Sequence, residues 1–312
     1  MKTFLKNKSI IFLVALHIVA VVIGLWQITQ QNGTPLFYQW KKPEPQIAIV
    51  QIQGMITSAA QGPLSSNLNA DQIAKHLKWI SEQKDIQAVV LRMNTPGGSV
   101  AAVQEIYDEL LRVKNSGKKI VVSMGEVAAS GGYYLAAPAD YIIANPGSIT
   151  GSIGVIFQVS NVQGLFKKIG VQMKSIKSAE HKDIGSPFKE MSDKERKIIQ
   201  SIIDGTYQQF VQVIVEGRKM NKAKVLQLAD GRIYSGAQAK ELGLIDDLGN
   251  LEKAIAKAVE LSGIEGKPKL IEMEDKFHKL FSMLGATTKF SFWSFPDATT
   301  GAKLAYAWEY GI

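Results

Sequence analysis

Cysteine is absent from this 312-residue chain, and histidine is scarce, with four residues. Without cysteine the protein can form neither a disulfide framework nor a thiolate metal site, and its chemistry cannot use a sulfur nucleophile. The formal net charge of +8 would suit an anionic membrane surface or nucleic acid. Because no RNA-binding aromatic motif and no C2H2 spacing accompany that charge, we expect no nucleic acid partner.

The composition is that of a folded protein. Hydrophobic residues make up 46% of the chain and charged residues 21%, a balance typical of globular rather than disordered proteins. At this length we expect one sizeable domain with appendages.

The N-terminus carries a long apolar run. Residues 10–28 follow Lys2, Lys6 and Lys8, and at ~1.5 Å per residue they would span ~28 Å, close to a ~30 Å hydrocarbon core. We interpret this run, which includes His17 as its one ionisable residue, as an uncleaved transmembrane helix. A cleaved signal peptide is the alternative, but no A-x-A site follows. The positive flank predicts a cytoplasmic N-terminus, with the rest of the chain outside the bacterial inner membrane.

The sequence divides into four segments. We expect a cytoplasmic stub and anchor at residues 1–28, a polar, proline-punctuated linker at 29–46, a folded domain at 47–263 and a tail at 264–312. Helical periodicity weakens in the tail, whose aromatic residues are expected to pack on the domain or on a neighbouring subunit. Contact with the membrane surface is the alternative.

Apolar strands alternate with amphipathic helices through the domain. Strands are expected in the runs "QIAIVQIQG", "AVVLRMN", "KIVVSM", "DYIIAN" and "IGVIFQV". Helices are expected within residues 69–85, at 100–114 and near 192–220; a short helix capped at Gly243, a strand and a closing helix follow up to 261. This alternation predicts an α/β fold of parallel βαβ units with helices flanking the sheet.

Two turns follow predicted strands at the place where open α/β sheets bind ligands. In "NTPGGSV", residues 94–100, the glycines let the backbone approach a bound group and direct an amide at it. Ser130 stands among small residues in "AASGG", where a sharp strand-to-helix turn would expose its hydroxyl as a nucleophile. The structural alternatives are a plain turn with Ser99 as helix N-cap and a small-residue packing seam capped by Ser130.

A serine nucleophile needs a base, and this sequence offers few. The four histidines are His17, His76, His181 and His278, of which at most one is a plausible partner. Lysine is the other option, but its pKa of ~10.4 must fall by about three units, at a cost of ~4 kcal/mol, before the amine is a base at neutral pH. Such a lysine must be buried in an apolar cleft, and composition alone cannot select it.

Four motifs resemble those of one family and occur in its order: "LRMNTPGGSV", "AASGGYYLAAPADYIIANPGSITGSIGVI", "IKSAEHKDIGSPFKEMSDKER" and "LADGRIYSGAQAKELGLIDDLG". From about residue 46 to 262 the chain resembles signal peptide peptidase A, a family of membrane-anchored Ser/Lys peptidases. The resemblance implies a Clp-protease-like, crotonase-related fold.

The resemblance also implies site residues. The family nucleophile falls on Ser130, its lysine base on Lys182, and the serine that orients the lysine on Ser152. Gly98 and Gly131 match the glycines whose amides form the oxyanion hole.

One position departs from the family pattern. The residue before the lysine base is usually tyrosine, and here it is His181. We therefore expect Lys182 to accept the proton and keep His181 as the alternative base.

For the chemistry, the resemblance implies acyl-enzyme hydrolysis of signal peptides and similar hydrophobic peptides without a metal or nucleotide cofactor. It also implies lipid contact through the N-terminal helix and a homo-oligomeric ring with inward-facing sites. The single set of motifs matches the short form of the family. The alternatives are a related inner-membrane peptidase for misfolded membrane proteins, an acyl-CoA enzyme of the crotonase class and a catalytically idle membrane scaffold.

Overall fold

The computed structural model describes residues 14–23, 45–58, 68–273 and 304–307. The chain separates into two units, Met1–Glu44 and Pro45–Ile312. Residues 14–23 of the first unit are helical. Within the described ranges, no helix has both the length and the apolar character needed to cross a membrane. The predicted anchor at 10–28 lies partly outside these ranges and stays a prediction.

A sheet of eight strands forms the centre of the second unit, with the order β10-β8-β6-β4-β1-β12 and with β7 and β11 branching from β6. The strands are β1 (Gln46–Gln53), β4 (Ile86–Thr95), β6 (Lys119–Ala129), β7 (Tyr141–Ala144), β8 (Ile149–Gly151), β10 (Ile233–Ser235), β11 (Asp247–Leu248) and β12 (Lys269–Met273). Apart from the antiparallel pair of β10 and β8, the described pairs of this sheet are parallel. The predicted mixed α/β architecture with parallel βαβ units is confirmed.

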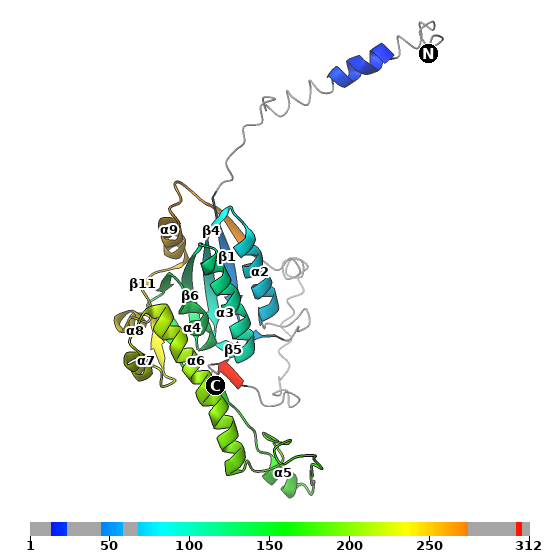
Figure 1. Ribbon diagram of the computed structural model, residues 1–312, viewed down its shortest axis with the longest axis vertical. Helices are drawn as coiled ribbons and strands as arrows, with labels where there is room; N and C mark the ends of the chain where they lie inside the picture. Colours follow the sequence, from blue (N-terminus) through cyan, green and yellow to red (C-terminus); the bar gives the residue numbers. More distant parts are fainter. Residues whose placement is uncertain (1–13, 24–44, 59–67, 274–303, 308–312) are drawn as a thin grey trace. The chain divides into compact units, whose positions relative to one another are not determined.

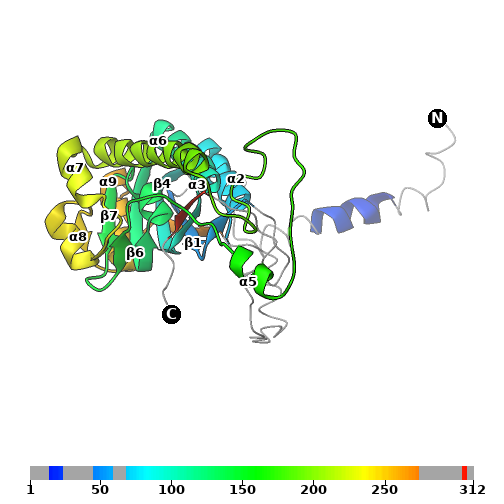
Figure 2. The same ribbon diagram turned by 90° about the horizontal axis from the view of Figure 1, so that it is seen from below.

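Helices cover both faces of this sheet. The described helices of this unit are α2 (Ala70–Glu82), α3 (Val100–Asn115), α4 (Gly131–Ala136), α5 (Gln163–Lys168), α6 (Asp193–Arg218), α7 (Lys222–Leu228), α8 (Gly236–Leu242) and α9 (Leu251–Ser262), of which α5 lies away from the sheet. Figure 1 shows α2 and α3 on one side of the sheet and α9 on the other, and Figure 2 shows α6 running beside α3. The long helix expected near residues 192–220 is therefore present as α6.

The alternation of side chains along β1 explains this two-sided cover. Ala48, Val50 and Ile52 belong to the larger apolar cluster, which includes residues of α2, α3 and α6. Ile47 and Ile49 point to the opposite face and join a smaller cluster with residues of α9. Because successive side chains of a strand point to opposite faces, a continuous apolar run is what a strand buried on both sides requires.

A second sheet lies at the end of the main one, with the order β3-β2-β5-β13-β9. Its strands are β3 (Leu68–Asn69), β2 (Ile56–Thr57), β5 (Gly97–Ser99), β13 (Leu304–Ala307) and β9 (Ile156–Phe157). Figure 1 shows β13, in red, beside β5. This sheet brings residues near the C-terminus next to the "NTPGGSV" motif, far away in the sequence.

Two sequence expectations differ from the described fold. The strand expected across "IGVIFQV" is reduced to β9, because Ser152 just before it has a positive φ of 49°, which turns the chain away from the regular sheet. Within the expected tail, β12 pairs in parallel with β1 and extends the main sheet. The aromatic residues 290–295 and Trp308, expected to pack on the domain, lie outside the described residues.

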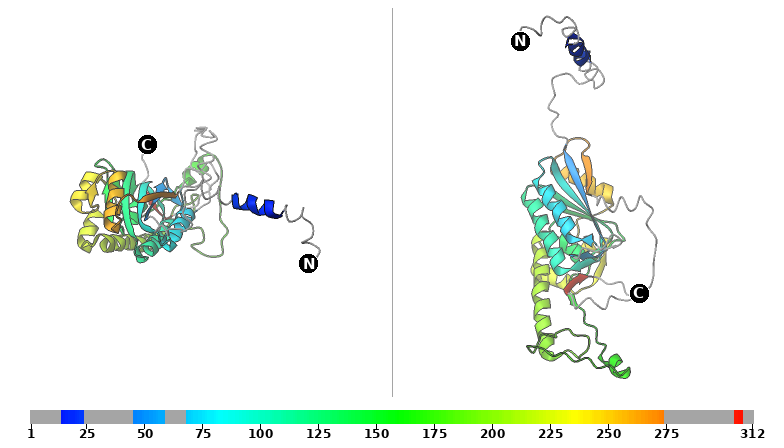
Figure 3. Two further views of the ribbon diagram at one scale, coloured as in Figure 1. Left: turned by 90° about the horizontal axis from the view of Figure 1, so that it is seen from above. Right: turned by 90° about the vertical axis from the view of Figure 1, so that its right-hand side faces the viewer.

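Residues 158–192, here called the arm, connect β9 to α6 and contain one short helix, α5. Figures 1 and 3 show the arm projecting past the N-terminal end of α6. Its exposed apolar side chains are Leu165, Ile169, Val171, Met173 and Ile176. An arm that is apolar at its surface is a candidate for contact with another molecule.

Candidate active site

Ser130 stands on a sharp turn between β6 and α4. Its backbone has φ 53° and ψ −115°, a region that non-glycine residues rarely adopt and that costs about 1–3 kcal/mol. Two hydrogen bonds hold this strained turn: the Ser130 N–H donates to the Gly151 carbonyl at 2.8 Å, and the Tyr134 N–H donates to the Ser130 carbonyl at 2.9 Å. The predicted strand-to-helix turn is therefore present, but the expected exposure of the hydroxyl is not, because Ser130 is buried, with 1% of its surface exposed.

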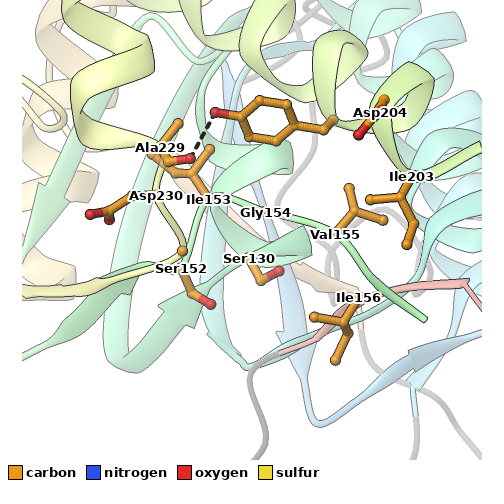
Figure 4. A pocket seen from close by; sticks show the side chains of 12 residues that line it. Ser130, Ser152, Ile153, Gly154, Val155, Ile156, Ile203, Asp204, Ala229 and Asp230 are labelled. Atoms are coloured by element: carbon orange, nitrogen blue, oxygen red, sulfur yellow. Dashed lines mark hydrogen bonds between the residues drawn. The ribbon is translucent and has the colours of Figure 1, made fainter. Parts of the chain in front are cut away.

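Ser152 comes to the same place from the neighbouring strand. β8 pairs in parallel with β6, with Gly151 opposite Ala129, so the residues that follow each strand lie side by side. Ser152 also has a positive φ, and its N–H donates to the Arg232 carbonyl at 2.8 Å. Figure 4 shows Ser130 and Ser152 together in the wall of one cavity.

The cavity has a volume of about 340 Å³ and is mostly apolar in character. It is lined by Ser130, Ser152, Ile153, Gly154, Val155, Ile156, Ile203, Asp204, Tyr207, Ala229, Asp230 and Gly231. The Tyr207 hydroxyl donates to the Ala229 carbonyl at 2.8 Å (Figure 4), which ties α6 to the loop before β10. The carboxylate of Asp230 forms an ion pair with Arg232.

The two candidate oxyanion glycines belong to elements in contact, β5 and α4. Gly131 is the first residue of α4, so its N–H has no partner within the helix and lies at the positive end of the helix dipole. Gly98 must be glycine, because a Cβ at this position would lie 2.0 Å from the Ile56 carbonyl oxygen. Gly98 is also paired with Tyr306 of β13.

Lys182 is not among the residues that line the cavity. It lies in a series of turns of the arm and its side chain is exposed. His181 precedes it, half-buried, with its Nε2 3.8 Å from a carboxylate oxygen of Glu180. Within one chain the structure therefore brings together Ser130 and Ser152, and it leaves Lys182 and His181 outside their cavity.

A chain of ion pairs fixes the part of the arm that carries Lys182. Asp183, its neighbour, pairs with Lys177 at 2.5 Å and Lys189 at 3.0 Å, and Lys189 also pairs with Glu195 in the first turn of α6. The cavity contacts α6 from Ile203 onwards, eight residues after Glu195, or ~12 Å along the helix axis at ~1.5 Å per residue. The ion pairs thus tie the segment around Lys182 to the first turn of α6 and not to the part of α6 that lines the cavity.

The charges of this network perturb its carboxyl groups. The hydrogen bond from Lys189 lowers the pKa of Glu195 to about 2, with a further contribution from the Ser192 N–H. Hydrogen bonds from Lys177 and Lys189 lower the pKa of Asp183 to about 2. Both carboxylates therefore stay ionised through the neutral pH range.

A serine on a strained strand-to-helix turn, beside backbone amides that can receive negative charge, is the arrangement of serine hydrolases. Residues 112–265 match the family model of peptidase family S49. The chain is 40% identical over 228 residues to "Putative protease slr0021" of Synechocystis, an alignment that covers 73% of this chain and 78% of the relative. The chain belongs to peptidase family S49 and is a serine protease.

Two other relatives are longer than the aligned part. Protease 4 of Salmonella typhi is 33% identical over 77% of this chain, which corresponds to 39% of that protein. "Putative signal peptide peptidase SppA" of Enterococcus faecium is 39% identical over 67% of this chain and 61% of its own length. These matches confirm the family identified from the four motifs.

Sequence reasoning did not predict two parts of the cavity surroundings. Ile203, Asp204 and Tyr207 of α6 line the cavity, although their helix was expected only to cover the sheet. β13 pairs with both β5 and β9, and its short sequence carries no motif. The isoleucines at 198, 199, 202 and 203 were the available signal for α6, and we find no signal for β13.

Replacing Glu195 by glutamine is expected to loosen the arm and lower protein stability. Because the pKa of Glu195 is lowered by folding, its stabilising contribution is fully present above the pKa of an ordinary glutamate, ~4.3, and is lost as the pH falls towards about 2. Thermal unfolding should give a difference in melting temperature between the wild type and Glu195→Gln. This difference should be constant from pH 6 to 8, which is ~2 pH units or more above the ordinary pKa of glutamate, and should shrink at lower pH.

The matched control is Glu180→Gln, which removes an exposed carboxylate of the arm paired with Lys194. An exposed pair contributes little, so this variant should unfold close to the wild type. An equal loss of stability in both variants would show that Glu195 has no special role.

Proposed function

We propose that this chain is a membrane-anchored endopeptidase in which Ser130 is the nucleophile and Lys182 the base. The observation that carries the proposal is the strained turn that places Ser130 beside Ser152 in an apolar cavity. The family membership supports the serine chemistry, and the order of the motifs supports Lys182 as its partner.

The reaction follows from these roles. The Ser130 hydroxyl attacks the scissile carbonyl carbon while the neutral amine of Lys182 takes its proton, and the amides of Gly98 and Gly131 stabilise the oxyanion. Lys182 then protonates the leaving amine as the C–N bond breaks, which leaves an acyl-enzyme. A water molecule deprotonated by Lys182 then attacks the ester carbon, and as the C–O bond to Ser130 breaks Lys182 returns the proton to the Ser130 oxygen and the acid product leaves. Ser152 orients the amine by accepting one of its hydrogen bonds.

The position of Lys182 requires a further condition. Since the lysine lies outside the cavity of its own chain and the arm is held by ion pairs, we propose that Lys182 acts in the cavity of a neighbouring copy within a homo-oligomeric ring. The exposed apolar side chains of the arm, such as Ile169 and Ile176, support such a contact. Covering the amine between two copies would also favour its neutral form.

Substrates are proposed to bind as extended peptides. β13 lies between β5 and β9 and is antiparallel to both, so an extended segment fits beside Gly98 at the edge of the cavity. The cavity wall is rich in aliphatic side chains, such as Ile153 and Val155, and should accept small or aliphatic residues beside the cut better than charged ones. Hydrophobic peptides such as cleaved signal peptides meet this demand.

The proposed location is the bacterial inner membrane. Residues 10–28 would form the single span, with lipid as their partner and the catalytic unit on the extracytoplasmic side. One relative carries the name signal peptide peptidase, which supports signal peptides as substrates. Misfolded membrane proteins are the alternative substrates, and profiling the cleavage of both classes with wild type and Ser130→Ala decides between them.

The dyad predicts non-additive mutants. Ser130→Ala and Lys182→Met should each lower kcat by ~10⁴-fold or more, and the double mutant should lose no more than either, because neither residue works without the other. Peptide hydrolysis measured under single-turnover conditions checks this. His181→Phe is the control and should keep most of its activity; an inactive His181→Phe with an active Lys182→Met would make His181 the base.

A base supplied by the neighbouring copy predicts complementation. When Ser130→Ala and Lys182→Met chains are co-expressed in equal amounts, about a quarter of the interfaces in a head-to-tail ring should combine an intact Ser130 with an intact Lys182. Activity of the purified mixture should return to that fraction of the wild type. A mixture that assembles and stays inactive would contradict the shared site.

The position of β13 predicts that the chain's own C-terminal segment competes with substrate. Ala305 is paired on both sides, with Ser99 and Ile156, so Ala305→Pro must remove a ladder hydrogen bond. We expect a higher kcat/KM for short peptides in this variant and no change in Ala305→Val, which keeps the N–H. A lower kcat/KM in Ala305→Pro alone would mean that β13 completes the site.

A further inference from the structure

Thr95 lies where the two backbone segments of the candidate oxyanion hole meet. It is the last residue of β4 and is fully buried. β5, which carries Gly98, begins two residues later, and the partner of Thr95 in β6 is Ala128, two residues before Ser130. Thr95 does not line the cavity, so it has no direct contact with a substrate there.

We propose that Thr95 is a positioning residue: its hydroxyl fixes the strand of Gly98, and its methyl group fixes the first turn of α4, which begins with Gly131. This inference rests on the proposed function, because it assigns Thr95 a role in the hydrolysis carried out by Ser130.

The hydroxyl group of Thr95 ties two chain segments together. It donates to the Gly54 carbonyl at 2.6 Å and accepts a hydrogen bond from the Gly97 N–H at 3.1 Å. β5 is three residues long, so its ladder alone orients it weakly. Gly97 has a positive φ of 100°, and a glycine backbone can adopt many other conformations at little cost. The hydrogen bond to the Gly97 N–H therefore fixes the orientation of the next residue, Gly98.

The methyl group of Thr95 packs on the other side of the site. A Cβ placed on Gly132 would lie 2.8 Å from Thr95 Cγ2, which shows that the methyl group touches the bare backbone of α4. Gly132 directly follows Gly131, so this contact sets how far the α4 amides stand from β5. The side chain of Thr95 therefore fixes the distance between the two candidate oxyanion glycines, Gly98 and Gly131.

The regular ladder does not provide this spacing. The register between β4 and β6 shifts between Met93 and Thr95, so strand pairing is interrupted at the site. Hydrogen bonds of side chains replace the interrupted strand pairing here. The Val127 N–H donates to Asn94 Oδ1 at 3.1 Å, and the Thr95 hydroxyl connects Gly54 and Gly97. An error of ~1 Å in the position of a catalytic group can lower the rate ~10²-fold, so these bridges matter for turnover.

The test compares two substitutions that separate the hydroxyl from the methyl group. Thr95→Val keeps the shape and removes both hydrogen bonds, and it should lower kcat by ~10- to 100-fold with KM within ~3-fold of the wild type. Thr95→Ser keeps the hydroxyl but removes the methyl group that packs on α4, so it should lower kcat by only ~3- to 10-fold, less than Thr95→Val. The affinity of a peptide boronate, whose adduct with Ser130 places an oxygen in the oxyanion hole, should fall in Thr95→Val by the same factor as kcat.

Thr206→Val is the matched control for stability. Thr206 is also buried, and its hydroxyl donates to the Ile202 carbonyl within α6 at 2.8 Å. Both valine variants should unfold at a lower temperature, but only Thr95→Val should lose kcat and boronate affinity. Equal losses of kcat in the two variants, or a normal kcat in Thr95→Val, would overturn the inference.

Two outcomes keep the inference separate from the proposed function. If Thr95→Val does not fold, a comparison of Thr95→Ser with Thr95→Ala still decides: both lack the methyl group and only Thr95→Ser keeps the hydroxyl, so an equal kcat in the two would overturn the role given to the hydroxyl group. If Ser130→Ala were as active as the wild type, the proposed function would be wrong. An inactive Ser130→Ala beside a fully active Thr95→Val would contradict the role of Thr95 alone.

Discussion

The positive backbone φ of Ser130 is the constraint on which the site depends. A serine keeps the unfavourable φ of 53° only if the surrounding contacts exclude its other backbone conformations. The Gly151 carbonyl binds the Ser130 N–H on one side, and on the other side Gly132 packs against Thr95. The parallel pairing of β8 with β6, the small residues after Ser130 and the turn at Ser152 all serve the same local geometry.

A second constraint separates the nucleophile from its proposed base. The arm that carries Lys182 is tied to the first turn of α6 by Lys189 and Glu195, whereas the cavity meets α6 further along the helix. A site divided in this way would be active only in the assembled oligomer. Such an arrangement would keep an isolated chain from hydrolysing peptides before it joins the proposed ring.

Much of the fold could be predicted because its signals are local. The apolar run of β1 and the periodicity of α6 each determine one element, and the alternation of elements determines the parallel sheet. Ser130 and Ser152 could be assigned to one site only through the resemblance of their motifs to a family, and the parallel pairing of β8 with β6 is what brings them together. That Lys182 lies outside the cavity of Ser130 and Ser152 could not be predicted. Its position depends on ion pairs among Lys177, Asp183 and Lys189, which no periodic pattern in the sequence indicates.

The central claim is that Ser130 is the nucleophile of this protease. Treating the full-length protein with a fluorophosphonate, followed by digestion and mass spectrometry, tests it most directly. The account predicts a covalent label on Ser130 at one equivalent per chain at most, with Ser152 unlabelled and the label abolished by prior reaction with a peptide aldehyde. A label on Ser152 while Ser130 stays free would contradict the account.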